Sequence, residues 1–175
     1  MSDEIAFPVL TSVLDCLCAA LEEEGRPVCW CGVRPMAQIP MDHCSCDGVP
    51  GNSCGQAYVN LAAMFPVDPF PRQAIALTEQ CAGVVMGVQV NAGIFRCLPG
   101  MDAHGNPPTV LQMMTATQTQ MDDMRTLLRV LMCCDIPGVP AKDGRSLGRY
   151  TPVGPNGDCG GGFWTITYRK TTGTG

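Results

Sequence analysis

The sequence contains few of the residues from which catalytic sites and nucleic-acid-binding surfaces are built. Among its 175 residues there are two histidines, and only 15% are charged. Its 11 Lys and Arg are outnumbered by 16 Asp and Glu, which gives a formal net charge of −5. Because neutralisation of phosphates requires clustered basic residues, this scattered basic set argues against a surface that binds nucleic acid.

Long apolar runs are also missing. No segment approaches the roughly 18 consecutive apolar residues that a membrane-spanning helix needs. Residues 1–4, Met-Ser-Asp-Glu, lack the basic region that opens a secretory signal peptide. We therefore expect no membrane span, no signal peptide and a protein that is made and folded in a cytoplasm.

Cysteine, in contrast, is abundant, with 12 residues. This density approaches that of disulfide scaffolds, whereas cytosolic proteins keep their thiols reduced. Cys16, Cys18, Cys133 and Cys134 fall in predicted helices, where near neighbours point in different directions and cannot bond one another. We expect these four, together with Cys81 and Cys97, to be small buried hydrophobic residues.

The densest cysteine cluster lies between residues 29 and 54. It comprises Cys29, Cys31, Cys44, Cys46 and Cys54, with His43 beside Cys44. In facing strands, the two Cys-x-Cys pairs could form a four-thiolate zinc site or cross-strand disulfides. Structural zinc sites usually have longer spacing within each arm, so this is a weak zinc signal. The expectation is free thiols, predominantly reduced and metal-free, with zinc and late disulfides as alternatives.

Hydrophobic periodicity and breakers divide the chain into alternating elements. The predicted helices cover residues 5–24 and about 28 residues after a cap at Asn106, which Pro107 follows at the first helical position. The predicted strands cover residues 27–33, 56–65, 82–98 and 163–168, the last of them after a turn-rich run over 150–162. The order α-β-β-β-α-β predicts an α+β fold, a mainly antiparallel sheet with the two principal helices packed on one face. We expect the chain to form a single domain over residues 1–170, with a long loop excursion at about 35–55 and a flexible tail at 171–175.

The second predicted helix carries a methionine-rich stripe. Its members recur at spacings of four and three: Val110, Met114, Thr117, Met121, Met124, Leu128 and Leu131. Such a stripe favours a helix packed on a sheet. The alternative is an adaptable surface that binds a partner, for which the flexible methionine side chain is suited.

Catalytic motifs are weak. Gly160–Gly162 lacks the Lys-Ser/Thr of a phosphate-binding loop and precedes a strand, which favours a flexible turn. His43 beside Cys44 is the one candidate for a nucleophile pair or metal ligand, and His104 lies in a polar loop. The adjacent carboxylates Asp122–Asp123 diverge by about 100° on a helix, which favours a solvated face. We predict that the protein is not an enzyme and has no catalytic, cofactor-binding or metal-binding residues.

Three stretches together carry a resemblance to a known family. They are Val88–Pro99, the helix opened by Asn106–Pro108 and ending at Leu131–Cys134, and Thr151–Thr165. They resemble head-to-tail junction proteins of long-tailed phages that infect actinobacteria, and in its element order the chain resembles the tail terminator. The resemblance covers the chain from Ile5 to Tyr168.

The resemblance implies a structural virion protein at the junction of tail and neck, assembled in the cytoplasm of the host. Proteins of this family form homo-oligomeric rings, usually hexamers, that end polymerisation of the tail tube and join the tail to the neck. The implied partners are further copies of the chain, the tail tube protein and the neck or stopper protein. DNA passes through the lumen without specific binding, and we expect Asp42, Asp47 and Asp68 to give that lumen a neutral or acidic wall.

Two alternatives stay open at this point. The chain could form another neck ring, a head-to-tail stopper or an adaptor. It could also be a small zinc-binding module for host takeover, centred on His43, Cys44, Cys46 and Cys54.

Overall fold

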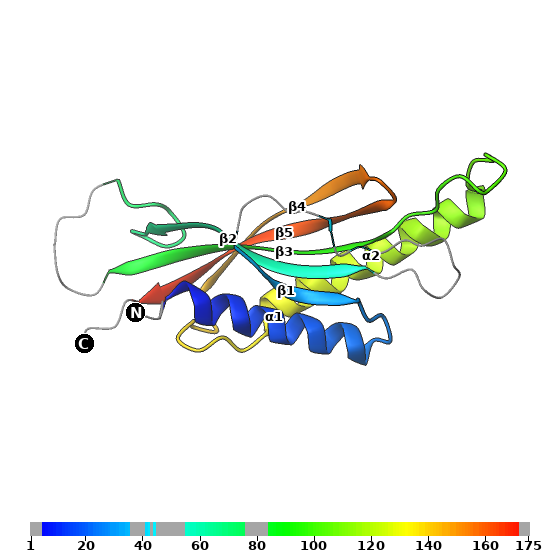
Figure 1. Cartoon of the computed structure of the whole chain (residues 1–175). Coiled ribbons are helices and arrows are strands. Elements are labelled where there is room, and N and C mark those ends of the chain that lie inside the picture. Colours follow the sequence, from blue (N-terminus) through cyan, green and yellow to red (C-terminus); the bar gives the residue numbers. More distant parts are fainter. Residues whose placement is uncertain (1–4, 36–40, 43, 45–54, 76–83, 172–175) are drawn as a thin grey trace.

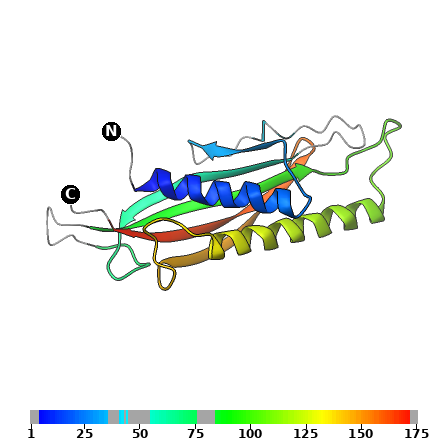
Figure 2. The same cartoon turned by 90° about the horizontal axis from the view of Figure 1, so that it is seen from below.

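The computed structural model describes residues 5–35, 41–42, 44, 55–75 and 84–171. Within them the chain forms α1 (Ala6–Glu23), β1 (Trp30–Arg34), β2 (Gln56–Pro66), β3 (Val85–Cys97), α2 (Val110–Cys133), β4 (Arg145–Asn156) and β5 (Cys159–Thr171). The strands form one sheet in the order β1-β2-β3-β5-β4, and both helices lie on one face of it (Figures 1 and 2). Only the β1–β2 pair is parallel among these strands. The predicted α+β class, mainly antiparallel sheet and element order are confirmed, with the last predicted strand forming a hairpin with β4.

The helix α1 is amphipathic and ends in a glycine cap. Its buried residues recur every three or four positions: Ala6, Val9, Leu10, Val13, Leu17, Ala20 and Leu21. At its C-terminus Gly25 adopts φ +66°, its N–H donates to the Glu22 carbonyl, and the Arg26 N–H donates to that of Leu21. This pair of bonds is a Schellman motif, which needs a left-handed residue where glycine has no Cβ penalty. The turn brings Arg26 back toward α2.

The main core lies between the helices and alternate residues of the strands. The strands contribute Ala57, Val59, Val88, Val90, Ala92, Ile94, Ile166 and Tyr168, and α2 contributes Leu127, Val130 and Leu131. Because successive strand residues point to opposite faces, Tyr58 and Phe95 lie on the other face, which we call the far face. Both are fully buried, and their rings stack with centroids 5.6 Å apart.

The helix α2 begins later than predicted. Its N-cap is Thr109, and Asn106 lies in the preceding loop. The Thr109 hydroxyl accepts a hydrogen bond from the Gln112 N–H at 3.2 Å, while the Gln112 side chain accepts one from the Thr109 N–H at 2.8 Å. This capping box satisfies two backbone donors at once, an advantage that Asn106 does not have here.

The prediction that residues 150–162 form a turn-rich run is wrong. Most of it belongs to the strands β4 and β5, which are joined by a turn at Gly157. Gly160–Gly162 is buried strand, not a flexible turn. A Cβ on Gly161 would lie 2.1 Å from the Ile94 carbonyl oxygen, so glycine allows the close approach of β3 and β5.

The expectation of free thiols is also wrong for most described cysteines. Disulfides join Cys16 to Cys134, Cys18 to Cys31 and Cys44 to Cys159. Cys29 and Cys97 are also disulfide-bonded, whereas Cys133 is free and exposed and is therefore not a buried hydrophobic residue. Cys46, Cys54 and Cys81 lie outside the described residues. These pairs could not be predicted from the sequence, because two of them join cysteines that are separated by 118 and by 115 positions. Only the tertiary structure brings such cysteines together.

Candidate functional site

Five of the ten exposed large hydrophobic residues in the described part of the chain lie in the N-terminal half of α2. We call residues Val110–Met121 the arm. Its apolar side chains remain exposed: Val110 by 77%, Leu111 by 74%, Met114 by 64%, and Met113 and Met121 by 48% each. No charged residue occurs in the arm, so it is an uncharged surface of Met, Leu, Val, Thr and Gln. Contiguous apolar surface of this kind marks an interaction site.

The arm is exposed because the sheet ends before α2 does. The buried residues of α2 all lie in its C-terminal half: Asp123, Thr126, Leu127, Val130 and Leu131. The Trp164 indole N–H donates to the Met124 carbonyl at 3.2 Å, which holds that half against β5. The first turns of α2 extend beyond the end of the sheet (Figures 1 and 2). The predicted packing of the whole stripe on the sheet is therefore wrong for the first half of the helix and only partly correct for the second, where Leu131 is buried but Met124 and Leu128 are only partly buried.

A shallow groove runs along the arm. It has a volume of about 480 Å³ and is lined by Pro108, Val110, Met113, Met114, Thr117, Gln118 and Met121. The Thr117 hydroxyl donates to the Met113 carbonyl within the helix. Methionine side chains adapt to irregular surfaces, so this lining is typical of a contact with another protein.

Asp123 anchors the arm to the body of the protein. It is only 4% exposed, and its carboxylate forms ion pairs with Arg26, after α1, and with Arg96 near the end of β3. The Arg96 Nε–Asp123 Oδ2 distance is 2.5 Å, and Arg96 also donates to the Arg26 carbonyl at 2.9 Å. The predicted solvated face is thus wrong for Asp123. Arg26 and Arg96 come from elements that are distant from α2 in sequence, so their ion pairs with Asp123 hold α2 against the rest of the fold. The role of Asp123 is therefore structural.

Glu24 extends this charged network toward the surface. It forms ion pairs with Arg26 and with Arg129, the latter at 2.6 Å, and accepts a hydrogen bond from Thr126 at 2.6 Å. Burial alone would raise the pKa of Glu24, but the hydrogen bonds from Thr126 and Arg26 and the charges of Arg26 and Arg129 together lower it. The ionised form of Glu24 is therefore favoured in the folded protein.

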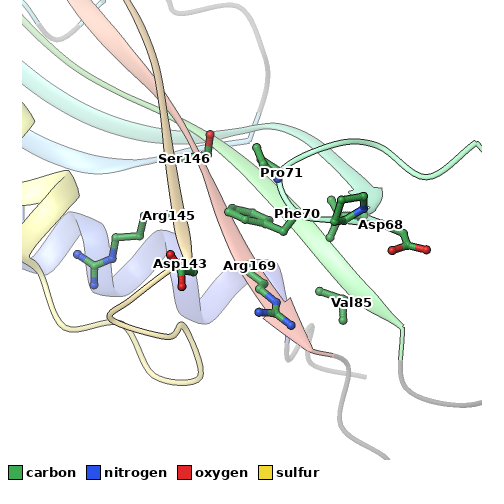
Figure 3. Close-up of a pocket in the computed structure, with 10 residues that line it drawn as sticks. Asp68, Phe70, Pro71, Val85, Asp143, Arg145, Ser146 and Arg169 are labelled. Carbon is green, nitrogen blue, oxygen red and sulfur yellow. The ribbon is translucent and has the colours of Figure 1, made fainter.

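A pocket of about 550 Å³ lies at the opposite end of the sheet from the arm. The turn over residues 67–71, which contains cis peptide bonds before Pro69 and Pro71, forms one wall. Val85 and the start of β4 and end of β5 form the other, and Figure 3 shows Phe70 between the turn and these strands. Arg145 points away from Phe70 toward the helices, where it donates to the Cys134 carbonyl at 2.5 Å. Apolar and charged side chains alternate around this pocket.

The other predicted candidates are scattered. Asp42 forms an ion pair with Arg34 of β1, and Asp68 lines the pocket in Figure 3. His104 lies in an exposed turn in which its N–H donates to Asp102. His43, Cys46, Asp47 and Cys54 lie outside the described residues. Of the ligands of the zinc-binding module, only Cys44 can be placed, and it is bonded to Cys159. Of the four-thiolate alternative, Cys31 is bonded to Cys18 and Cys29 is also disulfide-bonded.

A change in charge content along the sequence indicates where the arm ends. The run from Val110 to Met121 has no charge, whereas residues 122–129 contain two aspartates and two arginines. That change in composition marks the point where the helix leaves the body of the protein.

Comparison with known proteins finds no family model and no curated protein that matches this sequence. Neither α1 nor α2 combines the length and apolar character needed to cross a membrane.

Proposed function

We propose that the protein is a structural protein of the phage head-to-tail junction, a ring that ends polymerisation of the tail tube and joins the tail to the neck. The observation that carries this proposal is the uncharged, exposed arm at one end of the sheet. A surface with Met113, Met114 and Met121 exposed is suited to permanent contact with another copy of the chain. The resemblance of the sequence to tail terminators specifies the kind of ring.

The position of the arm supports assembly by a head-to-tail contact. The arm lies at one end of the sheet, and the pocket lined by Phe70 lies at the other. In the assembly that we propose, the arm of one copy binds the pocket end of the next. Such a heterologous contact uses two different patches, and it produces a closed ring when the rotation between copies closes.

Charge and cysteine chemistry agree with a role in the virion. The net charge of −5 provides little attraction for DNA phosphates, which suits a ring through which DNA must move. Disulfides such as Cys16–Cys134 persist in oxidising surroundings, which include virion surfaces. The placement of Asp42, Asp47 and Asp68 on the wall of the lumen remains a prediction.

The proposal is tested in the phage that encodes this chain. Deleting the gene should give overlong tails that carry no heads, because nothing stops the tube from growing. Complementation with Met132→Glu should restore normal particles, whereas Met114→Glu should not. Both changes place a carboxylate on an exposed methionine of α2, but only Met114 lies in the arm.

Tail length decides between the candidate rings. Tails of normal length that lack heads would favour the alternative of a stopper or adaptor ring. Tails of normal length with attached heads in the deletion strain would contradict a junction role altogether.

A further inference from the structure

Three cysteine sulfur atoms converge at one end of the sheet. The Sγ atoms of Cys44, Cys97 and Cys159 all lie within 4.8 Å of one another. Cys97 is the last residue of β3 and Cys159 the first of β5, and the two are direct partners in the antiparallel ladder. Cys44 reaches them from the segment between β1 and β2. Three segments that are far apart in sequence thus supply one sulfur each.

The three sulfurs are close enough together to serve as ligands of one metal ion once they are reduced. A tetrahedral zinc ion with Zn–S bonds of about 2.3 Å separates its sulfur ligands by about 3.8 Å. Cys44 and Cys159 are bonded to each other, so reduction must first let these two sulfurs move apart to about that separation. The Cys97 sulfur lies within 4.8 Å of both. The other disulfides lack this arrangement, since the described residues contain no other group of three potential ligands at this spacing.

The surroundings are suited to a structural ion. Cys159 is 3% exposed, while Cys44 and Cys97 are partly buried. The alternation along β3 places Cys97 on the same far face as the fully buried Phe95. A rigid strand pair supplies two of the sulfurs, so two ligands are preorganised by backbone hydrogen bonds, including Leu98 N–H to the Asp158 carbonyl at 2.7 Å.

We propose that Cys44, Cys97 and Cys159 bind a zinc ion when the protein is reduced. This differs from the module considered from the sequence, which used His43, Cys46 and Cys54. It is independent of the proposed junction role. The ion would tie the loop carrying Cys44 to the sheet before the disulfides form.

Conversion of the disulfide-bonded form to the zinc-bound form needs a reductant and releases protons. A phosphine gives two electrons to the Cys44–Cys159 disulfide and takes up the oxygen atom of one water molecule to become the phosphine oxide, and the two protons of that water complete two protein thiols. The disulfide of Cys97 is reduced in the same way, which leaves the Cys97 thiol and the thiol of its partner. Zn²⁺ then replaces one proton on each of the three thiols, and these protons pass to the buffer.

The test uses the full chain, reduced with a phosphine, supplied with zinc and then freed of excess metal. Elemental analysis should find about one zinc per chain, as expected of one thiolate site. Cys97→Ser, Cys159→Ser and Cys44→Ser should each lose that zinc. Cys133→Ser is the matched control, since Cys133 is a free and exposed cysteine away from the cluster, and it should keep its zinc.

A second measurement needs no substitution. Co²⁺ added to the reduced chain should give the intense near-ultraviolet absorption of thiolate-to-cobalt charge transfer, and one equivalent of Zn²⁺ should abolish it. Absence of this absorption, or zinc retained by all three cluster variants, would overturn the proposal. Loss of zinc from the Cys133 variant would also overturn it, because binding would then not belong to the cluster.

Discussion

Replacing Asp123 by Asn tests the claim that one buried carboxylate anchors α2 to the rest of the fold. Asn has nearly the same shape as Asp, so the change removes the charge with little effect on packing. Arg26 and Arg96 would then face each other across a neutral group. The matched control is Asp122→Asn, because the Asp122 side chain is 35% exposed and pairs only within its own helix, with Arg125 at 3.6 Å.

The size of the effect follows from burial. Removing one partner of a fully buried ion pair destabilises a protein by about 3 to 5 kcal/mol. Here the side chains of Arg26 and Arg96 are 22% and 17% exposed, so water can still solvate part of their charge when the carboxylate is removed. We expect Asp123→Asn to lower the free energy of unfolding by about 2 to 3 kcal/mol, and Asp122→Asn by roughly 0.5 kcal/mol or less.

Urea unfolding at neutral pH, with the disulfides intact, measures both variants against the parent protein. In a chain of this length the loss for Asp123→Asn corresponds to a fall in melting temperature of roughly 5 to 10 °C. If the two variants unfold within about 0.5 kcal/mol of each other, the buried cluster is not the anchor that we describe.

Two further predictions concern close packing and pH. Gly161→Ala should destabilise the protein by about 1 to 3 kcal/mol, because its Cβ would meet the Ile94 carbonyl. Gly154→Ala, where nothing lies within 4 Å of the new Cβ, should change stability by less than about 0.5 kcal/mol, and equal effects would contradict the packing described. The folded-state pKa of Glu24 lies below its unfolded value, so its contribution to stability is present above the unfolded pKa and is lost as pH falls through the folded pKa. Unfolding from pH 7 to pH 2 should therefore show a stability difference between the parent and Glu24→Gln that disappears in acid, and a constant difference would refute this assignment.

Local sequence signals predicted the elements of the fold well. The apolar periodicity of α1 and the β-branched residues of β3 each reflect interactions within one element, so the positions of these elements were predicted within a few residues. The same signals failed for β4, since Pro152 and Gly154 suggested turns. β4 is an edge strand, where such residues are tolerated.

The features that matter for function depend on tertiary contacts that local patterns do not contain. The stripe on α2 has one periodicity along its whole length, but the buried residues of α2 lie only in its C-terminal half, and of the stripe they include only Leu131. The convergence of Cys44, Cys97 and Cys159 depends on the pairing of β3 with β5 and on a disulfide between residues 115 positions apart. Neither the end of the sheet nor that pairing can be deduced from spacing along the chain.

The most direct test of the central claim is to identify what the arm contacts in the assembled particle. A photo-reactive amino acid at position 114 should cross-link to a second copy of the chain, at the end of the sheet that carries Phe70. The same amino acid at position 132 serves as the control and should give no such product. Cross-links from position 114 that remain within one chain, or that join only a different virion protein, would contradict assembly of the ring through the arm.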